Sequence, residues 1–126
     1  MDGNRPSDVL SSECPSRQVL RHLTSTWGVL VLIVLLKGEH RFSALKRRVG
    51  GVSERMLAQT LQQLEGDGMV LRVAHPVVPP HVVYSLTDLG QGAALRVQAL
   101  VGWLELALDD RAIASGDGKI GQICQV

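Results

Sequence analysis

The side chains between residues 53 and 63 carry the clearest chemical pattern in this chain. Apolar Leu57, Leu61 and Leu64 recur at i, i+4 and i+7, which predicts a helix with one buried face. Arginine and glutamine on the other face could form paired hydrogen bonds with guanine and adenine edges in the major groove of DNA. A merely solvated helix face is the alternative. The polar face consists of Ser53, Glu54, Arg55, Gln59, Gln62 and Gln63.

A second predicted helix precedes this one across a tight glycine turn. We expect it to begin at Ser43, whose hydroxyl would cap backbone N–H groups, and to end at Gly50-Gly51, where positive φ angles cost little. The following helix is expected to begin at Ser53. Residues 41–68 therefore predict a helix-turn-helix, a motif that can place its second helix in a DNA groove.

Positive charge is concentrated beside these two helices. Residues 37–48 hold five basic side chains and one acidic side chain, whereas the forty residues from Thr87 hold three basic and five acidic ones, in a chain of net charge +1. Such a cluster would meet phosphates and hold the register while the second helix reads bases. Its basic members are Lys37, Arg41, Lys46, Arg47 and Arg48.

The pattern after Gly68 becomes β-like. Residues 70–75 and 81–85 flank a proline-rich loop, which predicts a two-stranded hairpin, or wing. It carries Arg72, His75 and His81, which could touch the minor groove or the phosphates. The alternative is a β-ribbon that simply covers the core.

Two further helices are expected before the helix-turn-helix. Cys14-Pro15 is typical of a helix start, and this helix should run to about Leu23. Thr24, Ser25 and Thr26 can cap a helix that begins near Trp27 and ends before residue 38. Four β-branched residues within 29–36 leave a buried strand as the alternative, although caps at both ends favour the helix.

A long final helix should run from Thr87-Asp88 to about Asp109, with apolar side chains on two faces. One face would pack on the subunit's own core, and the other, together with Leu20, would form the interface of a symmetric dimer. The expected core stripe comprises Leu89, Ala93, Val97, Leu100, Val101, Leu104 and Leu108. The expected dimer stripe comprises Leu95, Ala99, Trp103 and Leu106.

Length and composition limit the remaining possibilities. The 126 residues, 45% of them hydrophobic, suit one domain over residues 14–110, with a flexible arm at 1–13 and a flexible tail at 111–126. The longest apolar run has eight residues, far below the roughly 18 of a membrane span, and no secretory pattern precedes it. We therefore expect a cytoplasmic protein with no membrane association. Its two cysteines, Cys14 and Cys124, form no disulfide framework and should be reduced.

An ordered set of residues extends from residue 14 to about 108. It consists of Cys14-Pro15, Trp27, Arg41-Phe42-Ser43 with Leu45, Ser53 with Arg55, Leu57, Leu61 and Leu64, Asp67-Gly68, Pro79-Pro80, Tyr84-Ser85-Leu86-Thr87 and Leu89-Gly90. Through this set the chain resembles HxlR-type transcriptional regulators, a branch of the MarR-related winged-helix proteins. The resemblance implies a mainly α winged helix-turn-helix with a small β-hairpin, dimerising through terminal helices and binding double-stranded DNA. Residues 53–63 would be the reading helix and 73–83 the wing.

The resemblance has further implications for regulation. Repression at a pseudo-palindromic operator is the usual outcome in this family. Members tend to carry basic residues where this chain has Thr60, Gln62 and His81, which suggests weaker phosphate anchoring or a different operator. In several branches the cysteine equivalent to Cys14 senses oxidants, electrophiles or aldehydes. A helix N-terminus lowers the pKa of a thiol and favours the reactive thiolate, whereas a cysteine that only packs or caps is the alternative.

Enzymatic function is not expected, because no nucleophile, base and orienting group can be assembled from local motifs. The histidines show no metal-ligand spacing, so no metal and no cofactor are expected. The alternative function is a winged-helix module that binds a small effector or a protein without binding DNA.

Overall fold

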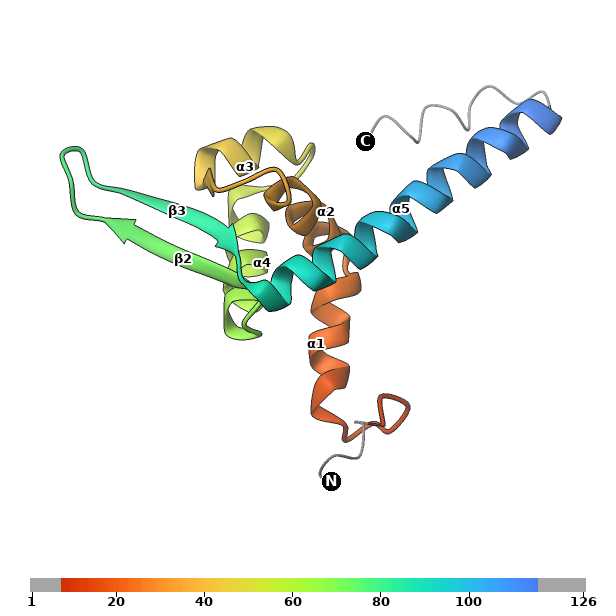
Figure 1. Cartoon of the computed structure of the whole chain (residues 1–126), viewed down its shortest axis with the longest axis horizontal. Helices are drawn as coiled ribbons and strands as arrows, with labels where there is room; N and C mark the ends of the chain where they lie inside the picture. The colour runs from red at the N-terminus through yellow and green to blue at the C-terminus, as the bar shows by residue number, and fades with distance from the viewer. Residues whose placement is uncertain (1–7, 116–126) are drawn as a thin grey trace.

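Within residues 8–115, the fold consists of five helices and a three-stranded antiparallel sheet (Figure 1). The computed structural model describes residues 8–115, with side chains as far as Asp110. In chain order the elements are α1 (Pro15–Thr24), α2 (Thr26–Leu35), β1 (His40–Arg41), α3 (Phe42–Arg48), α4 (Glu54–Gly66), β2 (Val70–His75), β3 (His81–Leu86) and α5 (Asp88–Ser115).

Helix α2 forms the centre of the core. It is apolar on all sides, as expected of a helix that contacts α1, α3, α4, α5 and β3. Its buried side chains include Val31, Leu32 and Leu35. The helix interpretation of residues 29–36 is confirmed, and so is a cap before it: the Gly28 N–H donates to Ser25 Oγ at 3.1 Å.

The predicted helix-turn-helix is formed by α3 and α4. Ser53 is the N-cap of α4, as predicted, because its Oγ accepts a hydrogen bond from the Met56 N–H at 3.0 Å. The predicted cap at Ser43 is wrong: α3 begins at Phe42 after Arg41, which makes no side-chain cap, and Ser43 lies inside the first turn. Gly51 supplies the positive φ of 85° that the turn between the helices requires.

The sheet has the strand order β1-β3-β2. The predicted hairpin is confirmed, with Arg72 opposite Tyr84 and His75 opposite His81. Strand β1 was not predicted, because two residues are too few to show an alternating pattern. It pairs Arg41 with Val83 and so ties the start of α3 to the hairpin.

The junction between the hairpin and α5 is tightly built around Thr87, which caps α5 as predicted. Its Oγ1 donates to the Gly68 carbonyl at 2.6 Å and accepts from the Gly90 N–H at 2.9 Å. A Cβ on Gly90 would lie only 1.9 Å from the Met69 carbonyl oxygen. Glycine at this position therefore allows α5 to approach the turn that follows α4.

Two details of α5 differ from the prediction. The helix runs to Ser115, beyond the expected end near Asp109 and into the predicted tail; residues 1–7 and 116–126 lie outside the described residues. The core stripe is also wrong in part, because Leu89, Leu100 and Leu104 are exposed. Val97 is buried as predicted, and the other buried positions are Gly90 and Ala94, since the close approach at Gly90 rotates this face inward.

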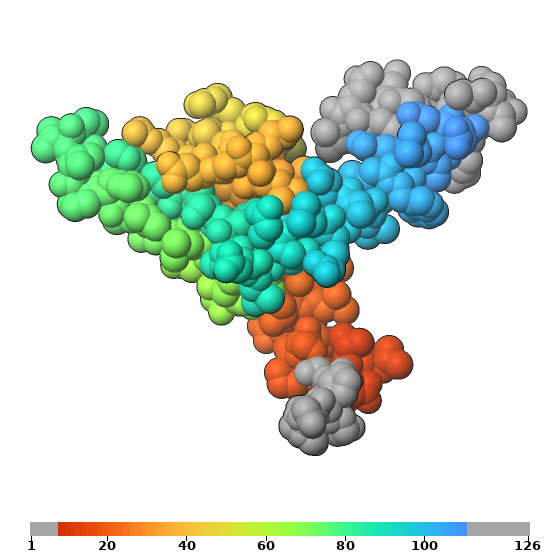
Figure 2. All heavy atoms as spheres, in the orientation of Figure 1, coloured from red at the N-terminus to blue at the C-terminus, as the bar shows by residue number. Residues whose placement is uncertain are grey.

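Three parts of the molecule extend away from the centre (Figures 1 and 2). The hairpin projects on one side, α1 on another, and the distal half of α5 on a third. Among the described residues, no single helix is both long and apolar enough to cross a membrane; α1 and α2 meet that test only together, and the chain bends by 73° between them.

Candidate nucleic-acid interface

The outer face of α4 presents most of the predicted reading side chains to solvent. Leu57, Leu61 and Leu64 are buried, which fixes the rotation of the helix about its axis. The opposite side is consequently exposed, whereas Gln63 is half-buried at the edge. The exposed polar side chains are Glu54, Arg55, Gln59 and Gln62. Ser53 is exposed as well, but its hydroxyl is engaged in the cap of α4.

Thr60 does not belong to this face. Its side chain is only 4% exposed and lies with the core residues of α4. A basic residue at this position would be buried, so the suggestion that Thr60 weakens phosphate anchoring is wrong. Gln62 is exposed, and His81 is half-buried on the hairpin.

The basic cluster lies on β1 and α3. Arg41, Arg47 and Arg48 are exposed, and Lys46 is half-buried. Ser43, which does not cap the helix, is exposed on the first turn of α3. Three cationic side chains in the last turn also suit the negative end of the α3 dipole, so part of their effect is local stabilisation.

The hairpin carries the remaining predicted residues. Arg72 is exposed on β2. His75 and His81 face each other across the two strands, with stacked rings whose centroids are 4.8 Å apart and whose planes differ by 25°. The pair stands next to the proline-rich loop, at the far end of the hairpin from the core (Figure 1).

Contacts between elements place these three groups around one part of the molecule. Strand β2 packs against α4, and α3 packs against β1 and β3. The sheet therefore links the two helices of the motif, since its β2 edge contacts the predicted reading helix and β1 and β3 contact the basic helix. This is the geometry of a winged helix-turn-helix, in which the second helix of the motif is left open on one side.

Cys14 lies where the sequence placed it, as the N-cap of α1, with Pro15 at the first helical position. It is half-buried, and its Sγ lies 2.9 Å from Ser16 Oγ.

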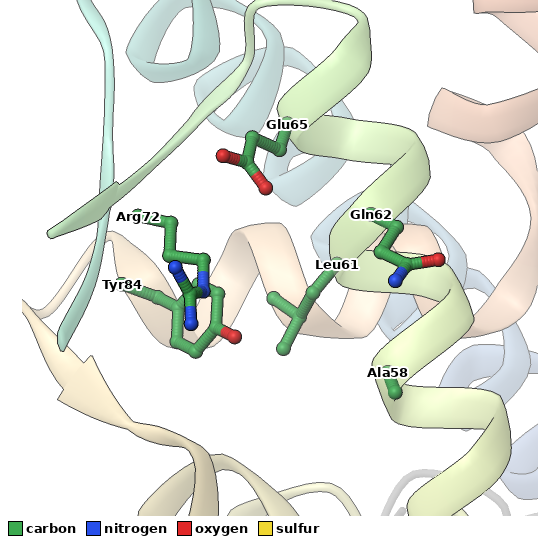
Figure 3. Close-up of a pocket in the computed structure, with 6 residues that line it drawn as sticks. All are labelled: Ala58, Leu61, Gln62, Glu65, Arg72 and Tyr84. Carbon is green, nitrogen blue, oxygen red and sulfur yellow. The ribbon is translucent and has the colours of Figure 1, made fainter. Parts of the chain in front are cut away.

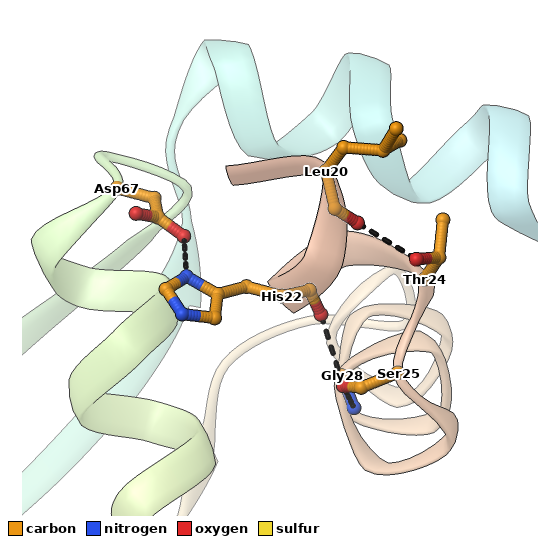
Figure 4. Close-up of polar contacts among 6 residues, drawn as sticks. All are labelled: Leu20, His22, Thr24, Ser25, Gly28 and Asp67. Carbon is orange, nitrogen blue, oxygen red and sulfur yellow. Dashed lines mark hydrogen bonds and ion pairs between the residues drawn. The ribbon is translucent and has the colours of Figure 1, made fainter. Parts of the chain in front are cut away.

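Helix α1 is connected to the end of α4 by a contact that sequence reasoning missed (Figure 4). His22 Nδ1 lies 2.6 Å from Asp67 Oδ2, and these side chains are only 11% and 12% exposed. The residues are 45 positions apart, and no local pattern pairs them.

The second apolar stripe of α5 is uncovered within one chain. Leu95, Ala99, Trp103 and Leu106 are all exposed, Trp103 to 65%, and so is Leu20 on α1. Leu100 and Leu104, expected in the core, enlarge this apolar surface.

The fold and this arrangement define a winged helix-turn-helix protein. The HxlR-like helix-turn-helix family matches residues 22–112. The chain belongs to this family of transcriptional regulators. It is 56% identical over 106 residues to YtfH of Escherichia coli (strain K12), an uncharacterized HTH-type transcriptional regulator, with 84% of each chain covered.

Solved structures show the same similarity. The transcriptional regulator ytfH from Salmonella typhimurium superposes with a TM-score of 0.79 at 53% identity, covering 88% of this chain and 99% of that one. The redox regulator HypR in its oxidized form superposes with a TM-score of 0.65 at 32% identity, covering 71% and 93%.

Proposed function

We propose that this protein binds double-stranded DNA in a sequence-specific way and acts as a homodimeric repressor at a pseudo-palindromic operator. The observation that carries the proposal is the rotation of α4: its apolar side is buried, and Arg55, Gln59 and Gln62 are exposed on the other. These side chains match the hydrogen-bonding edges of guanine and adenine.

The neighbouring elements would hold the reading helix in register. Arg41, Lys46, Arg47 and Arg48 supply charge for phosphates, and Ser43 lies among them. Arg72, His75 and His81 place hydrogen-bond donors on the wing. Ser53, Glu54 and Gln63 complete the proposed contact set on α4. A regulator of this kind works beside the chromosome, which supports the cytoplasm as its location.

The homodimer is supported by the exposed stripe on α5. A helix apolar on two faces needs a second partner, and a symmetric copy supplies the same stripe in return. Two copies related by a two-fold axis would present two reading helices to successive half-sites.

Selection of bound duplexes from random DNA tests sequence readout. The wild-type protein should enrich a two-fold symmetric site, and Arg55→Ala should weaken binding to that site by about 1–3 kcal/mol while relaxing preference at one base per half-site. Arg17→Ala, which removes an exposed arginine from α1, is the control and should leave the preference unchanged. A wild-type protein that enriches no sequence contradicts the proposal and favours a module for an effector or a protein partner.

A redox switch at Cys14 is a second element of the proposal. Its N-cap position favours the thiolate, and similarity to the redox regulator HypR agrees with it. The thiolate sulfur would attack hydrogen peroxide, break the O–O bond and form a sulfenic acid, and the departing hydroxide would take a proton from solvent and leave as water. Peroxide should then change DNA affinity in the wild type but not in Cys14→Ser. Equal responses in both proteins count against a sensing role.

A further inference from the structure

A pocket lies between α4 and the hairpin, beside the proposed reading face (Figure 3). Its volume is about 400 Å³, within the range of roughly 300–1,000 Å³ that is usual for small-molecule sites. Six residues line it: Ala58, Leu61, Gln62 and Glu65 of α4, Arg72 of β2 and Tyr84 of β3.

The regular geometry of the two elements brings these side chains together. The four α4 residues are spaced i, i+3, i+4 and i+7, so they share one side of the helix. Arg72 and Tyr84 are direct partners across β2 and β3, so they share one face of the sheet. Each wall is fixed by backbone hydrogen bonds, and the pocket does not depend on a loop.

The two walls of the pocket carry opposite charges. The Glu65 carboxylate and the Arg72 guanidinium project into the space between helix and hairpin, from opposite walls (Figure 3). Within residues 8–110, neither side chain forms a hydrogen bond or an ion pair, with the other or with any neighbour. The apolar base of the pocket is formed by Ala58 and the half-buried Tyr84 ring, because Leu61, only 1% exposed, offers almost no surface.

This lining selects among chemical classes of ligand. A simple anion would pair with Arg72 but would be repelled by Glu65. A simple cation would pair with Glu65 but would be repelled by Arg72. A wholly apolar molecule would remove water from two charges without replacing their hydrogen bonds. A small zwitterion with an apolar body satisfies both charges and covers the apolar base.

We propose that this pocket binds a free α-amino acid with an apolar side chain. The carboxylate would accept two parallel hydrogen bonds from Arg72, and the ammonium would donate to Glu65. The apolar side chain would pack on Ala58 and the Tyr84 ring. The Tyr84 hydroxyl and the Gln62 amide offer further donors and acceptors.

Occupation of the pocket would weaken DNA binding, a consequence that rests on the proposed function. Gln62 and Arg72 belong both to the pocket and to the proposed DNA-contact surface. A ligand that engages them removes two contacts from the DNA complex, and reciprocity requires DNA to weaken ligand binding to the same degree.

Tyr84 provides a direct reporter, because it is the single tyrosine of the chain. Protein labelled with 3-fluorotyrosine gives one ¹⁹F resonance, located in the pocket. Titration with leucine in the absence of DNA should shift this resonance in a saturable way, and glycine should bind more weakly because it lacks the apolar side chain. Isoamylamine and 4-methylpentanoate, which are leucine without its carboxylate and without its ammonium, should each bind roughly 10- to 100-fold more weakly than leucine.

Variants then test whether the charges of Glu65 and Arg72 bind the ligand. Glu65→Gln and Arg72→Gln should each raise the dissociation constant of leucine by roughly 10- to 100-fold. Glu39→Gln and Arg17→Gln remove the same charges from exposed positions outside the pocket and should leave it unchanged. Absence of a saturable shift with glycine, alanine, leucine and phenylalanine, up to about 10 mM, overturns the proposal. Equal binding of leucine and its two one-charge analogues overturns the zwitterion assignment.

A DNA-binding measurement tests separately whether leucine binding in the pocket changes the affinity for DNA. Saturating leucine should raise the dissociation constant for the selected duplex by about tenfold, and Glu65→Gln should abolish that effect. A saturable ¹⁹F shift with unchanged DNA affinity would show that the pocket binds leucine but that its occupation does not weaken DNA binding. If the protein binds no DNA, the proposed function fails, and the ¹⁹F titration still decides whether the site exists.

Discussion

At the scale of single residues, the contact between His22 and Asp67 is the main long-range polar link of the described chain. The two side chains are nearly buried and 2.6 Å apart, and Asp67 is the residue that follows α4 as its C-cap. Since the carboxylate can only accept, Nδ1 of His22 carries the proton. The link holds α1, whose N-cap is Cys14, against the end of the reading helix.

Replacement of His22 by alanine should lower the free energy of unfolding by about 1–3 kcal/mol, because the nearly buried Asp67 carboxylate loses its partner. Urea denaturation monitored by far-UV circular dichroism measures this change. His40→Ala is the matched control: among the described residues the His40 ring hydrogen-bonds to the nearby Gly38 carbonyl and to no charged group, so the loss should be under about 1 kcal/mol. Equal losses of unfolding free energy in the two variants would show that the contact between His22 and Asp67 contributes no particular stability.

At the scale of elements, capping and periodicity were sufficient for most of the architecture. Ser25, Ser53 and Thr87 were predicted as caps, and each one accepts the expected backbone hydrogen bond. These signals are local and need no knowledge of the tertiary fold. They fixed the starts of α2, α4 and α5 within one residue.

The features that sequence reasoning missed all depend on distant contacts. Strand β1 exists because Arg41 reaches Val83, and the pocket requires α4 to face the Arg72–Tyr84 pair. The core face of α5 was misassigned because side-chain size alone favoured the leucines. Tertiary packing instead buried Gly90 and Ala94, where small residues allow close approach.

The junction at Gly90 gives a test of this packing. Gly90→Ala should destabilise the fold by about 1–3 kcal/mol or more, because its Cβ would meet the Met69 backbone. Gly66→Ala, in the last turn of α4 with nothing within 4 Å of the added Cβ, should instead gain up to about 1 kcal/mol of stability. Thermal unfolding compares the two variants. A stabilising Gly90→Ala would contradict the close approach.

The exposed stripe of α5 leads to a prediction about assembly. Trp103→Glu should shift the protein from dimer to monomer in sedimentation velocity, because a buried carboxylate without a partner is costly in a subunit interface. Gln98→Glu adds the same charge at an exposed polar position of α5 and should leave the dimer intact. A monomeric wild-type protein, or a dimer unaffected by Trp103→Glu, would exclude this interface.

At the scale of the whole molecule, the basic cluster and the apolar stripe of α5 lie on different elements. The basic residues of α3 lie on a helix that contacts the sheet, whereas the longest row of exposed apolar side chains follows α5, which extends away from the centre (Figure 1). A chain with net charge of only +1 can therefore attract a polyanion at the basic cluster. The stripe on α5 remains available for association with a second copy.

This arrangement predicts how DNA affinity depends on salt. The logarithm of the association constant should fall linearly with the logarithm of salt concentration, with a slope of about −0.9 for each phosphate contacted. Arg47→Gln combined with Arg48→Gln removes two exposed cations per subunit, so in a dimer the slope should become shallower by about 3–4 units. Arg17→Gln with Arg21→Gln makes the same change in net charge on α1 and should leave the slope nearly unchanged. Fluorescence anisotropy at several salt concentrations measures both slopes. If the slope becomes shallower by the same amount in the two double variants, net charge rather than the α3 cluster governs binding, and the proposed phosphate contacts are wrong.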